Sequence, residues 1–254
     1  MQWLEDKGID PQRITTGLAL LAAVVVIGWI DNFFLMWLVF GGLYLLAFYE
    51  ANKLFGIENN TLYAYAAILW LVAGFYPYPD DLFFIAALVF ASVLAYTKEL
   101  KFKYFYPFIY PTAGFLFMLT LYNEYGVIAL FWLLVIVAGT DVGAYVVGKS
   151  IGKTRFSETS PNKTLEGVIG GVVIATLLGF LIGVNFVDID KAIVISLLSA
   201  IAAVFGDLFE SYLKRRANVK DSGDILPGHG GILDRVDGYL FSVIIMLVLL
   251  RGLV

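Results

Sequence analysis

The chain is a succession of long apolar segments separated by short polar breaks. An α-helix needs about 20 mostly apolar residues to cross the hydrocarbon core of a bilayer. We therefore expect an all-α polytopic membrane protein with about nine transmembrane helices, at roughly residues 14–30, 33–49, 61–76, 82–97, 105–122, 126–147, 167–187, 191–213 and 237–252. Neither an internal repeat nor a low-complexity tract divides the chain, so residues 1–254 are predicted to form a single integral membrane domain.

The composition supports a membrane protein. Hydrophobic residues make up 60% of the chain and charged residues only 15%, whereas soluble domains have about 45–50% and about 25%. The absence of cysteine excludes disulfides, thiolate metal sites and a cysteine nucleophile. The acidic start lacks the basic region of a cleavable signal peptide, so we expect the first apolar segment to be retained. Glycines between residues 167 and 183 recur at three- and four-residue spacing, which in lipid predicts close helix packing.

Lysine and arginine are distributed unevenly between the two sides of this arrangement. If the N-terminus and every second connection lie on one side, that side holds 15 of the 17 Lys and Arg residues, and the other side holds only Lys191 and Arg251. Because cytoplasmic loops are enriched in these residues, the split predicts a cytoplasmic N-terminus. The two longest polar connections, about 148–166 and 214–236, also fall on the cytoplasmic side.

One stretch, residues 207–237, gathers acids, basic residues, several glycines and the only histidine of an otherwise apolar chain. Carboxylates can bind a hard divalent cation, and Lys and Arg can bind phosphate oxygens. The Pro-Gly-His-Gly-Gly turn lets backbone approach a ligand closely, because glycine has no Cβ. The residue types alone therefore suggest a site for a metal ion and a polyphosphate.

Three acids in different predicted spans fall at a similar depth. Asp141 lies late in the sixth span, Asp207 late in the eighth, and Asp234 where the ninth begins. Ionisable residues within spans are costly and are functional candidates by default. We expect all three at the cytoplasmic boundary of the membrane; the alternative for any one of them is a paired or snorkelling side chain at a helix end. Tyr145 lies one helical turn after Asp141 on the same face, and Ser211 and Lys214 lie one and two turns after Asp207.

The loop between residues 148 and 167 is basic and rich in hydroxyl groups. It is not a P-loop, because Gly148 precedes Gly152 by four residues instead of five and no strand comes before it. The loop suits anionic ligands; the alternative is a juxtamembrane patch attracted to anionic lipid headgroups. His229, between two glycines of the other polar loop, could donate to a phosphate or transfer a proton, or could serve only as a turn residue.

The polar stretch contains three motifs: Ser211-x-Leu213-Lys214-Arg215, Lys220-Asp221-x-Gly223, and Leu226-Pro227-x-His229-Gly230-Gly231-Ile232-x-Asp234-Arg235-Val236-Asp237. Together they resemble the complete signature of the phosphatidate cytidylyltransferase (CDP-diacylglycerol synthase) family. Two upstream runs resemble the same family, Asp141-x-x-Ala144-Tyr145-x-x-Gly148 and Ser160-Pro161-x-Lys163-Thr164-x-Glu166-Gly167. Residues 126–254 thus form the catalytic half by this resemblance, and residues 1–125 match only as apolar spans without a diagnostic residue.

The resemblance implies a reaction in which CTP and phosphatidate give CDP-diacylglycerol and pyrophosphate, with Mg²⁺ and room for a second cation nearby. It implies metal ligands at Asp207, Asp234 and Asp141. Catalytic roles are implied for Asp207, Asp234, Lys214, Arg215, His229 and Arg235. Substrate contacts are implied for Ser160, Lys163, Thr164, Glu166, Ser211, Lys220, Asp221, Gly230, Gly231 and Tyr145.

The partners implied by the resemblance are CTP, phosphatidate and the lipid bilayer itself, with no nucleic acid; a homodimer is compatible with them. In a bacterium the protein would lie in the inner or cell membrane. Two other functions fit parts of the pattern. A CTP-dependent polyprenol or phytol kinase would transfer the γ-phosphoryl group instead, and a secondary transporter would also place acids within its spans.

Overall fold

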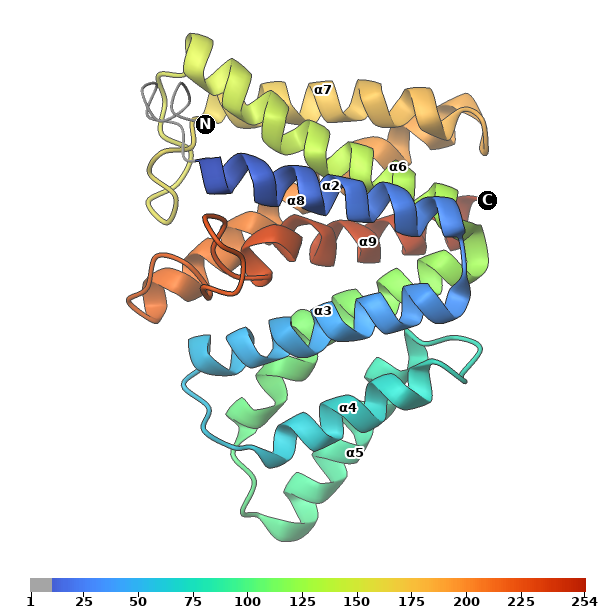
Figure 1. Cartoon of the computed structure of the whole chain (residues 1–254), viewed down its shortest axis with the longest axis vertical. Helices are drawn as coiled ribbons and strands as arrows, with labels where there is room; N and C mark the ends of the chain where they lie inside the picture. Colours follow the sequence, from blue (N-terminus) through green and yellow to red (C-terminus); the bar gives the residue numbers. More distant parts are fainter. Residues whose placement is uncertain (1–10) are drawn as a thin grey trace.

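The computed structural model describes residues 11–254 of the chain (Figure 1). The regular elements in this range are helices, and its two isolated β-bridges lie one in each long polar loop. This confirms the all-α prediction. In chain order the elements are α2 (Pro11–Ile30), α3 (Phe33–Leu54), α4 (Thr61–Ala73), α5 (Asp81–Thr97), the 3-10 helix η1 (Phe102–Phe105), the π-helical turn η2 (Phe108–Thr112), α6 (Ala113–Ile151), α7 (Leu165–Gly183), α8 (Ile189–Arg216) and α9 (Leu233–Leu253).

Several helices are suited to a bilayer. Within the described range, five stretches are long and apolar enough to cross a membrane: α3, the run from η1 through α6 (Phe102–Ile151), α7, α8 and α9. Helices α4 and α5 are shorter apolar helices, as is the Thr15–Ile30 part of α2. The protein is therefore an integral, multi-pass membrane protein, and each predicted span falls on one of these helices.

Helix α6 contains a bend that the sequence locates only approximately. Gly126 has φ 73° and ψ −175°, outside the helical range, and glycine adopts a positive φ without steric cost. In Figure 1 the chain before the bend runs toward the end of the molecule that holds the C-terminus, and the chain after it runs back. The predicted fifth span (105–122) thus covers η2 and the first arm of α6, the predicted sixth span (126–147) is the second arm, and the bend lies at Gly126, directly after the predicted break at residues 123–125.

The two long polar loops lie at the same end of the helices. Figure 1 shows residues 152–164 (yellow) and 217–232 (orange to red) near the start of α2, with the C-terminus at the opposite end. The two loops are separated by two helices, α7 and α8, so they are expected to lie on the same side of a membrane. Residues 1–10, which include Lys7 and the acidic start, lie outside the described residues.

Glycines hold α6 and α7 close together. A Cβ added to Gly143 would lie 2.9 Å from the Cα of Gly171, and one added to Gly171 would lie 2.5 Å from the carbonyl oxygen of Thr140. This confirms the close packing that the small-residue spacing predicts. The contact holds the last part of α6 beside the first part of α7, and the 152–164 loop connects these two helices.

An arginine joins three elements at the opposite end of the molecule. The Arg251 guanidinium, in the last turn of α9, forms forked ion pairs with two carboxylates. Its Nη1 and Nη2 lie 2.5 and 3.1 Å from the Asp80 oxygens, and its Nη2 and Nε lie 2.5 and 2.9 Å from those of Glu124. Asp80 also accepts from the Thr120 hydroxyl at 3.0 Å. The arginine therefore ties α9 to α5 and to the bend of α6.

Replacing Arg251 with methionine is expected to lower the free energy of unfolding by about 1–3 kcal/mol, because Asp80, whose side chain is 4% exposed, loses its charged donors. Thermal unfolding of the purified protein in detergent measures the effect. Lys191→Met is the control, because Lys191 pairs with a largely exposed Asp188 and exposed pairs contribute little. Equal midpoints for the two variants would contradict this assignment.

Candidate functional site

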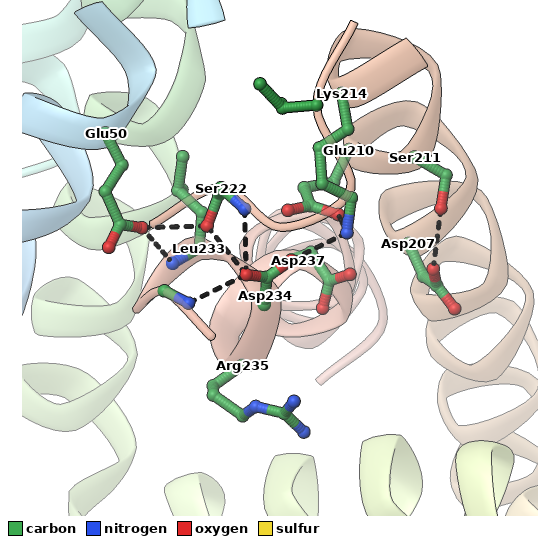
Figure 2. A network of polar contacts seen from close by, with 12 residues as sticks. Glu50, Asp207, Glu210, Ser211, Lys214, Ser222, Leu233, Asp234, Arg235 and Asp237 are labelled. Carbon is green, nitrogen blue, oxygen red and sulfur yellow. Dashed lines mark hydrogen bonds and ion pairs between the residues drawn. The ribbon is translucent and has the colours of Figure 1, made fainter. Parts of the chain in front are cut away.

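Asp234, in the first turn of α9, lies at the centre of a network of polar contacts (Figure 2). Its Oδ1 accepts a hydrogen bond from Lys214 Nζ at 2.6 Å. Its Oδ2 accepts from the backbone N–H groups of Gly231 at 2.8 Å and Ser222 at 2.9 Å. The 217–232 loop thus folds around this carboxylate, and one of its two oxygens is fully occupied by backbone donors.

Lys214 links two acids from different helices. Its Nζ lies 2.5 Å from Glu210 Oε2, one turn earlier on α8, and 2.6 Å from Asp234 Oδ1 on α9. The Glu210 side chain is fully buried, and that of Lys214 is 13% exposed. A buried charge is tolerated only when it is paired, so this lysine balances acids that the helices would otherwise bury without a counter-ion.

Asp207 brings the other polar loop into the site. It forms an ion pair with Lys163, near the end of the 152–164 loop, and its Oδ1 lies 3.4 Å from Ser211 Oγ. Burial lowers the pKa of the Lys163 ammonium group, whereas the carboxylates of Asp141 and Asp237 act in the opposite direction. Five acids and two lysines from α6, α8, α9 and this loop therefore share one region, and Asp141, Asp207 and Asp234 are among these acids.

The 152–164 loop is held by its own side chains. Glu166, in the first turn of α7, accepts from the backbone N–H of Lys153 at 3.1 Å and from the Thr154 hydroxyl at 2.8 Å. Thr164 is the N-cap of α7 and accepts from Gly167 N at 3.2 Å. The Ser160 carbonyl accepts from Lys163 N at 3.1 Å. These contacts shape the loop that presents Lys163.

Replacing Glu166 with alanine is expected to loosen this loop, because three donors of Lys153 and Thr154 lose their acceptor. Trypsin should then cleave after Lys153 and Arg155 several-fold faster than in the unchanged protein. Glu158→Ala is the matched control, since Glu158 is an exposed acid of the same loop. Cleavage of the Glu166 variant at the control rate would contradict the role given to its carboxylate.

His229 contributes backbone as well as a side chain. Its carbonyl oxygen accepts from Arg235 Nε at 3.0 Å and Nη2 at 2.7 Å. The flanking Gly228 and Gly230 have φ of 73° and 82°, values that glycine adopts far more easily than other residues. The imidazole lies near α2, where a Cβ added to Gly17 would be 3.7 Å from Nε2. The glycine turn thus presents the His229 carbonyl to Arg235 and leaves the imidazole near α2.

Some of the residues singled out in the sequence have accessible side chains. Tyr145 is 66% exposed, and its hydroxyl lies 3.5 Å from Lys149 Nζ on the same helix. Asp141 is also exposed, although it acts electrostatically on Lys163. In the 214–232 region, Arg215, Lys220 and Asp221 are among the exposed residues. These groups are available to a ligand without displacement of a buried contact.

The sequence reasoning missed Glu50. This residue of α3 is 1% exposed, and its carboxylate accepts from Ser222 Oγ at 2.9 Å, Ile232 N at 2.9 Å and Leu233 N at 2.8 Å. It lies directly after the predicted 33–49 span, so the rule that marks acids at span ends would have found it. The N-terminal half therefore supplies a buried acid to the polar site.

Comparison with known proteins agrees with the motifs. A model of the cytidylyltransferase family matches residues 11–253. The chain belongs to the cytidylyltransferase family. Its similar relatives include a phosphatidate cytidylyltransferase from Helicobacter pylori strain J99, 45% identical over 244 residues, which are 95% of this chain and 92% of the relative. The protein of that name from H. pylori strain 26695 is 44% identical over 238 residues, 92% of this chain and 90% of the relative.

A more distant relative carries the same name. The phosphatidate cytidylyltransferase of Thermotoga maritima is 36% identical over 249 residues, 90% of this chain and 92% of its own length. The cytidylyltransferase match extends over every helix from α2 to α9. The family relationship therefore includes the N-terminal half, with helix α3, as well as the motif-bearing half.

Membership of this cytidylyltransferase family implies use of a divalent cation, and the acids of the site suit one. The described residues include no cluster of three or more His, Asp or Glu side chains that could hold a metal ion by themselves. Mg²⁺ is commonly bound by one or two carboxylates together with substrate phosphates, so a site of this kind needs no such cluster. Asp207 and Asp234 offer the hard oxygen donors, and Lys163 and Lys214 neutralise them.

Proposed function

We propose that this protein is a phosphatidate cytidylyltransferase, which converts CTP and phosphatidate into CDP-diacylglycerol and pyrophosphate. The observation that carries the proposal is the pairing of Asp207 with Lys163 and of Asp234 with Lys214, in which the family's motifs from two separate loops meet at one end of the helices. Near full-length similarity to relatives of that name supports the substrates. The site combines oxygen donors for a cation with ammonium groups for phosphates, as two phosphate-bearing substrates require.

The chemistry needs charge neutralisation more than a base. The attacking group is a phosphomonoester oxygen, largely dianionic near neutral pH since its second pKa is about 6. It must approach the α-phosphorus of an anionic triphosphate, and the bond from that phosphorus to the pyrophosphate oxygen breaks as the new P–O bond forms. Positive groups aimed at the phosphates lower the repulsion and stabilise the charge on the leaving pyrophosphate. When bound, a divalent cation supplies part of that neutralisation.

We assign the cation to Asp207 and Asp234, with Asp141 beside them. Lys163 and Lys214 already lie against these carboxylates, so each is positioned to donate to a phosphate oxygen when substrates and cation enter. A second cation would find its remaining donors among the acids near Lys163, which include Asp237. In-line transfer depends on positioning, and the buried network around Asp234 provides it.

Residues in the two polar loops and at the adjoining helix ends are assigned to the substrates. Arg215, Lys220, His229 and Arg235 would bind the phosphates of CTP and phosphatidate. Gly230 lets the backbone come close to the nucleotide, whereas Gly231 is buried and donates its N–H to Asp234. The remaining contacts are assigned to Tyr145, Ser160, Ser211 and Asp221. Glu166 and Thr164 have partners that shape the 152–164 loop, so their contribution is proposed to be the placement of Lys163.

We propose nine membrane spans, with the two arms of α6 counted separately, and a cytoplasmic N-terminus. The polar loops at one end of the helices support this topology, because the predicted cytoplasmic loops carry most of the lysine and arginine. CTP would then reach the site from the cytoplasm and phosphatidate from the adjacent leaflet. A homodimer remains compatible with this arrangement.

Labelled CTP tests the proposed function against its alternatives. Purified protein is incubated with phosphatidate and CTP that carries label at either the α- or the γ-phosphorus. Cytidylyl transfer predicts that the α-label enters the lipid and the γ-label leaves as pyrophosphate. A γ-label in the lipid would show a CTP-dependent kinase instead. If the purified protein carried an ion flux and formed no lipid product, a transporter would be favoured.

A further inference from the structure

Helix α9 begins without a capping side chain of its own. Its N-cap residue is Ile232, which makes no side-chain capping bond. The first N–H groups of a helix have no partner within the helix, and buried ones must be satisfied from elsewhere. Glu50 of α3 satisfies two of them: Oε1 accepts from Ile232 N at 2.9 Å and Oε2 accepts from Leu233 N at 2.8 Å. The cap of α9 is therefore supplied by a residue 182 positions earlier in the chain.

The same carboxylate also holds the 217–232 loop. Ser222 Oγ lies 2.9 Å from Glu50 Oε2 and 3.0 Å from Asp234 Oδ2, so its single proton bonds to one carboxylate at a time. The backbone N–H of Ser222 donates to Asp234 in addition. Figure 2 shows Ser222 between the two acids. Glu50 and Asp234 thus hold one loop from opposite sides.

The Glu50 carboxylate explains why the motifs have glycine at positions 223 and 231. A Cβ added to Gly223 would lie 2.5 Å from Glu50 Oε1, and one added to Gly231 would lie 2.5 Å from Glu50 Oε2. Real Cβ atoms essentially never approach so closely, and the carboxylate cannot withdraw without losing its backbone donors. The loop sequence is therefore matched to a buried acid on another helix.

We infer that Glu50 is a positioning residue for the reaction: it fixes the start of α9 and the 217–232 loop, and through them the direction in which Asp234 presents its Oδ1. This inference rests on the proposed function. Because Asp234 Oδ2 is occupied by loop backbone, any loosening of that loop would turn the carboxylate away from Lys214 and from the position in which it would hold a cation. Residues that orient a ligand carboxylate commonly change metal affinity or activity about 10- to 100-fold when they are replaced.

Glu50→Gln is the principal test, since glutamine keeps the side-chain volume but presents an amide N–H to one of the donors. We expect the Mg²⁺ concentration for half-maximal activity to rise about tenfold and kcat to fall about 10- to 100-fold. Hydrogen exchange at residues 222–234 should accelerate, while exchange in α6 and α7 stays as in the unchanged protein. Ser222→Ala, which removes only the hydroxyl bridge, should give a smaller shift in the same direction and serves if the glutamine variant does not fold.

Asp80→Asn is the matched control, because Asp80 is also a buried acid, 2% exposed, but lies at the opposite end of the molecule. It should lower the unfolding temperature without changing the Mg²⁺ requirement. If Glu50→Gln and Ser222→Ala leave both Mg²⁺ dependence and local exchange unchanged, the inference is wrong. Absence of α-label transfer by the unchanged protein would instead refute the proposed function, and the exchange measurement distinguishes the two failures because it needs no activity.

Discussion

Replacing Asp234 with asparagine is expected to lower cytidylyl transfer about 1,000-fold, the upper range for removal of one preorganised electrostatic group. Asparagine has the same shape, but it removes the charge that balances Lys214 and holds a cation. Its amide can also accept at only one position, so either the lysine or the backbone donors of Gly231 and Ser222 lose their acceptor. Both the electrostatics and the geometry of the site change together.

The measurement is transfer of α-labelled CTP to lipid across a Mg²⁺ titration. The matched control is Asp190→Asn, because Asp190 is an exposed acid in the first turn of α8, far from the polar end; it should stay within about twofold of the unchanged rate. Asp207→Asn should resemble Asp234→Asn. Retention of most activity by Asp234→Asn at ordinary Mg²⁺ would remove this residue from the proposed cation site.

Replacing Lys214 with methionine is expected to have the largest effect on stability. The change leaves Glu210, fully buried, and Asp234, 7% exposed, without their shared counter-ion. Removal of one partner from a buried pair costs about 3–5 kcal/mol. The same change removes a phosphate-binding group, so activity should also fall. The unfolding midpoint in detergent and the rate of label transfer measure the two effects separately.

A double variant separates charge balance from catalysis. Lys214→Met with Glu210→Leu removes the fully buried acid together with its partner, and buried ion pairs can often be replaced by apolar residues without loss of stability. The double variant should regain most of the lost stability and none of the lost activity. Recovery of activity would mean that Lys214 serves only to balance Glu210, which would contradict its assignment to the substrates.

Much of the fold was predictable because the bilayer restricts it. Apolar segment length predicts the helices, since a span must satisfy all of its backbone groups internally. The order of the spans also predicts that Asp207 and Asp234 lie on the same side as the 148–166 loop, and the Lys163–Asp207 pair agrees. The sequence predicts a break at residues 123–125 but not the bend at Gly126 itself, because apolar length does not specify a single φ value.

The partners within the site were harder to predict. Glu50 is separated from Ile232 and Leu233 by about 180 residues, and no local pattern links a carboxylate to backbone N–H groups on another helix. The hydrogen-bond partners of Glu166 and Thr164 could not be predicted from the sequence either. Their residue types fit anion binding or helix capping equally well, and only the three-dimensional arrangement shows that their oxygens accept from the chain itself.

The most direct test of the central claim follows the oxygen atoms of the lipid phosphate. Phosphatidate carrying ¹⁸O in its terminal phosphate oxygens is incubated with the purified protein, CTP and Mg²⁺, and the products are analysed by mass spectrometry. Direct attack on the α-phosphorus predicts CDP-diacylglycerol that retains all of the label, together with unlabelled pyrophosphate. Release of CDP with a lipid pyrophosphate, or unchanged phosphatidate under conditions in which the protein is folded, would contradict the proposed function.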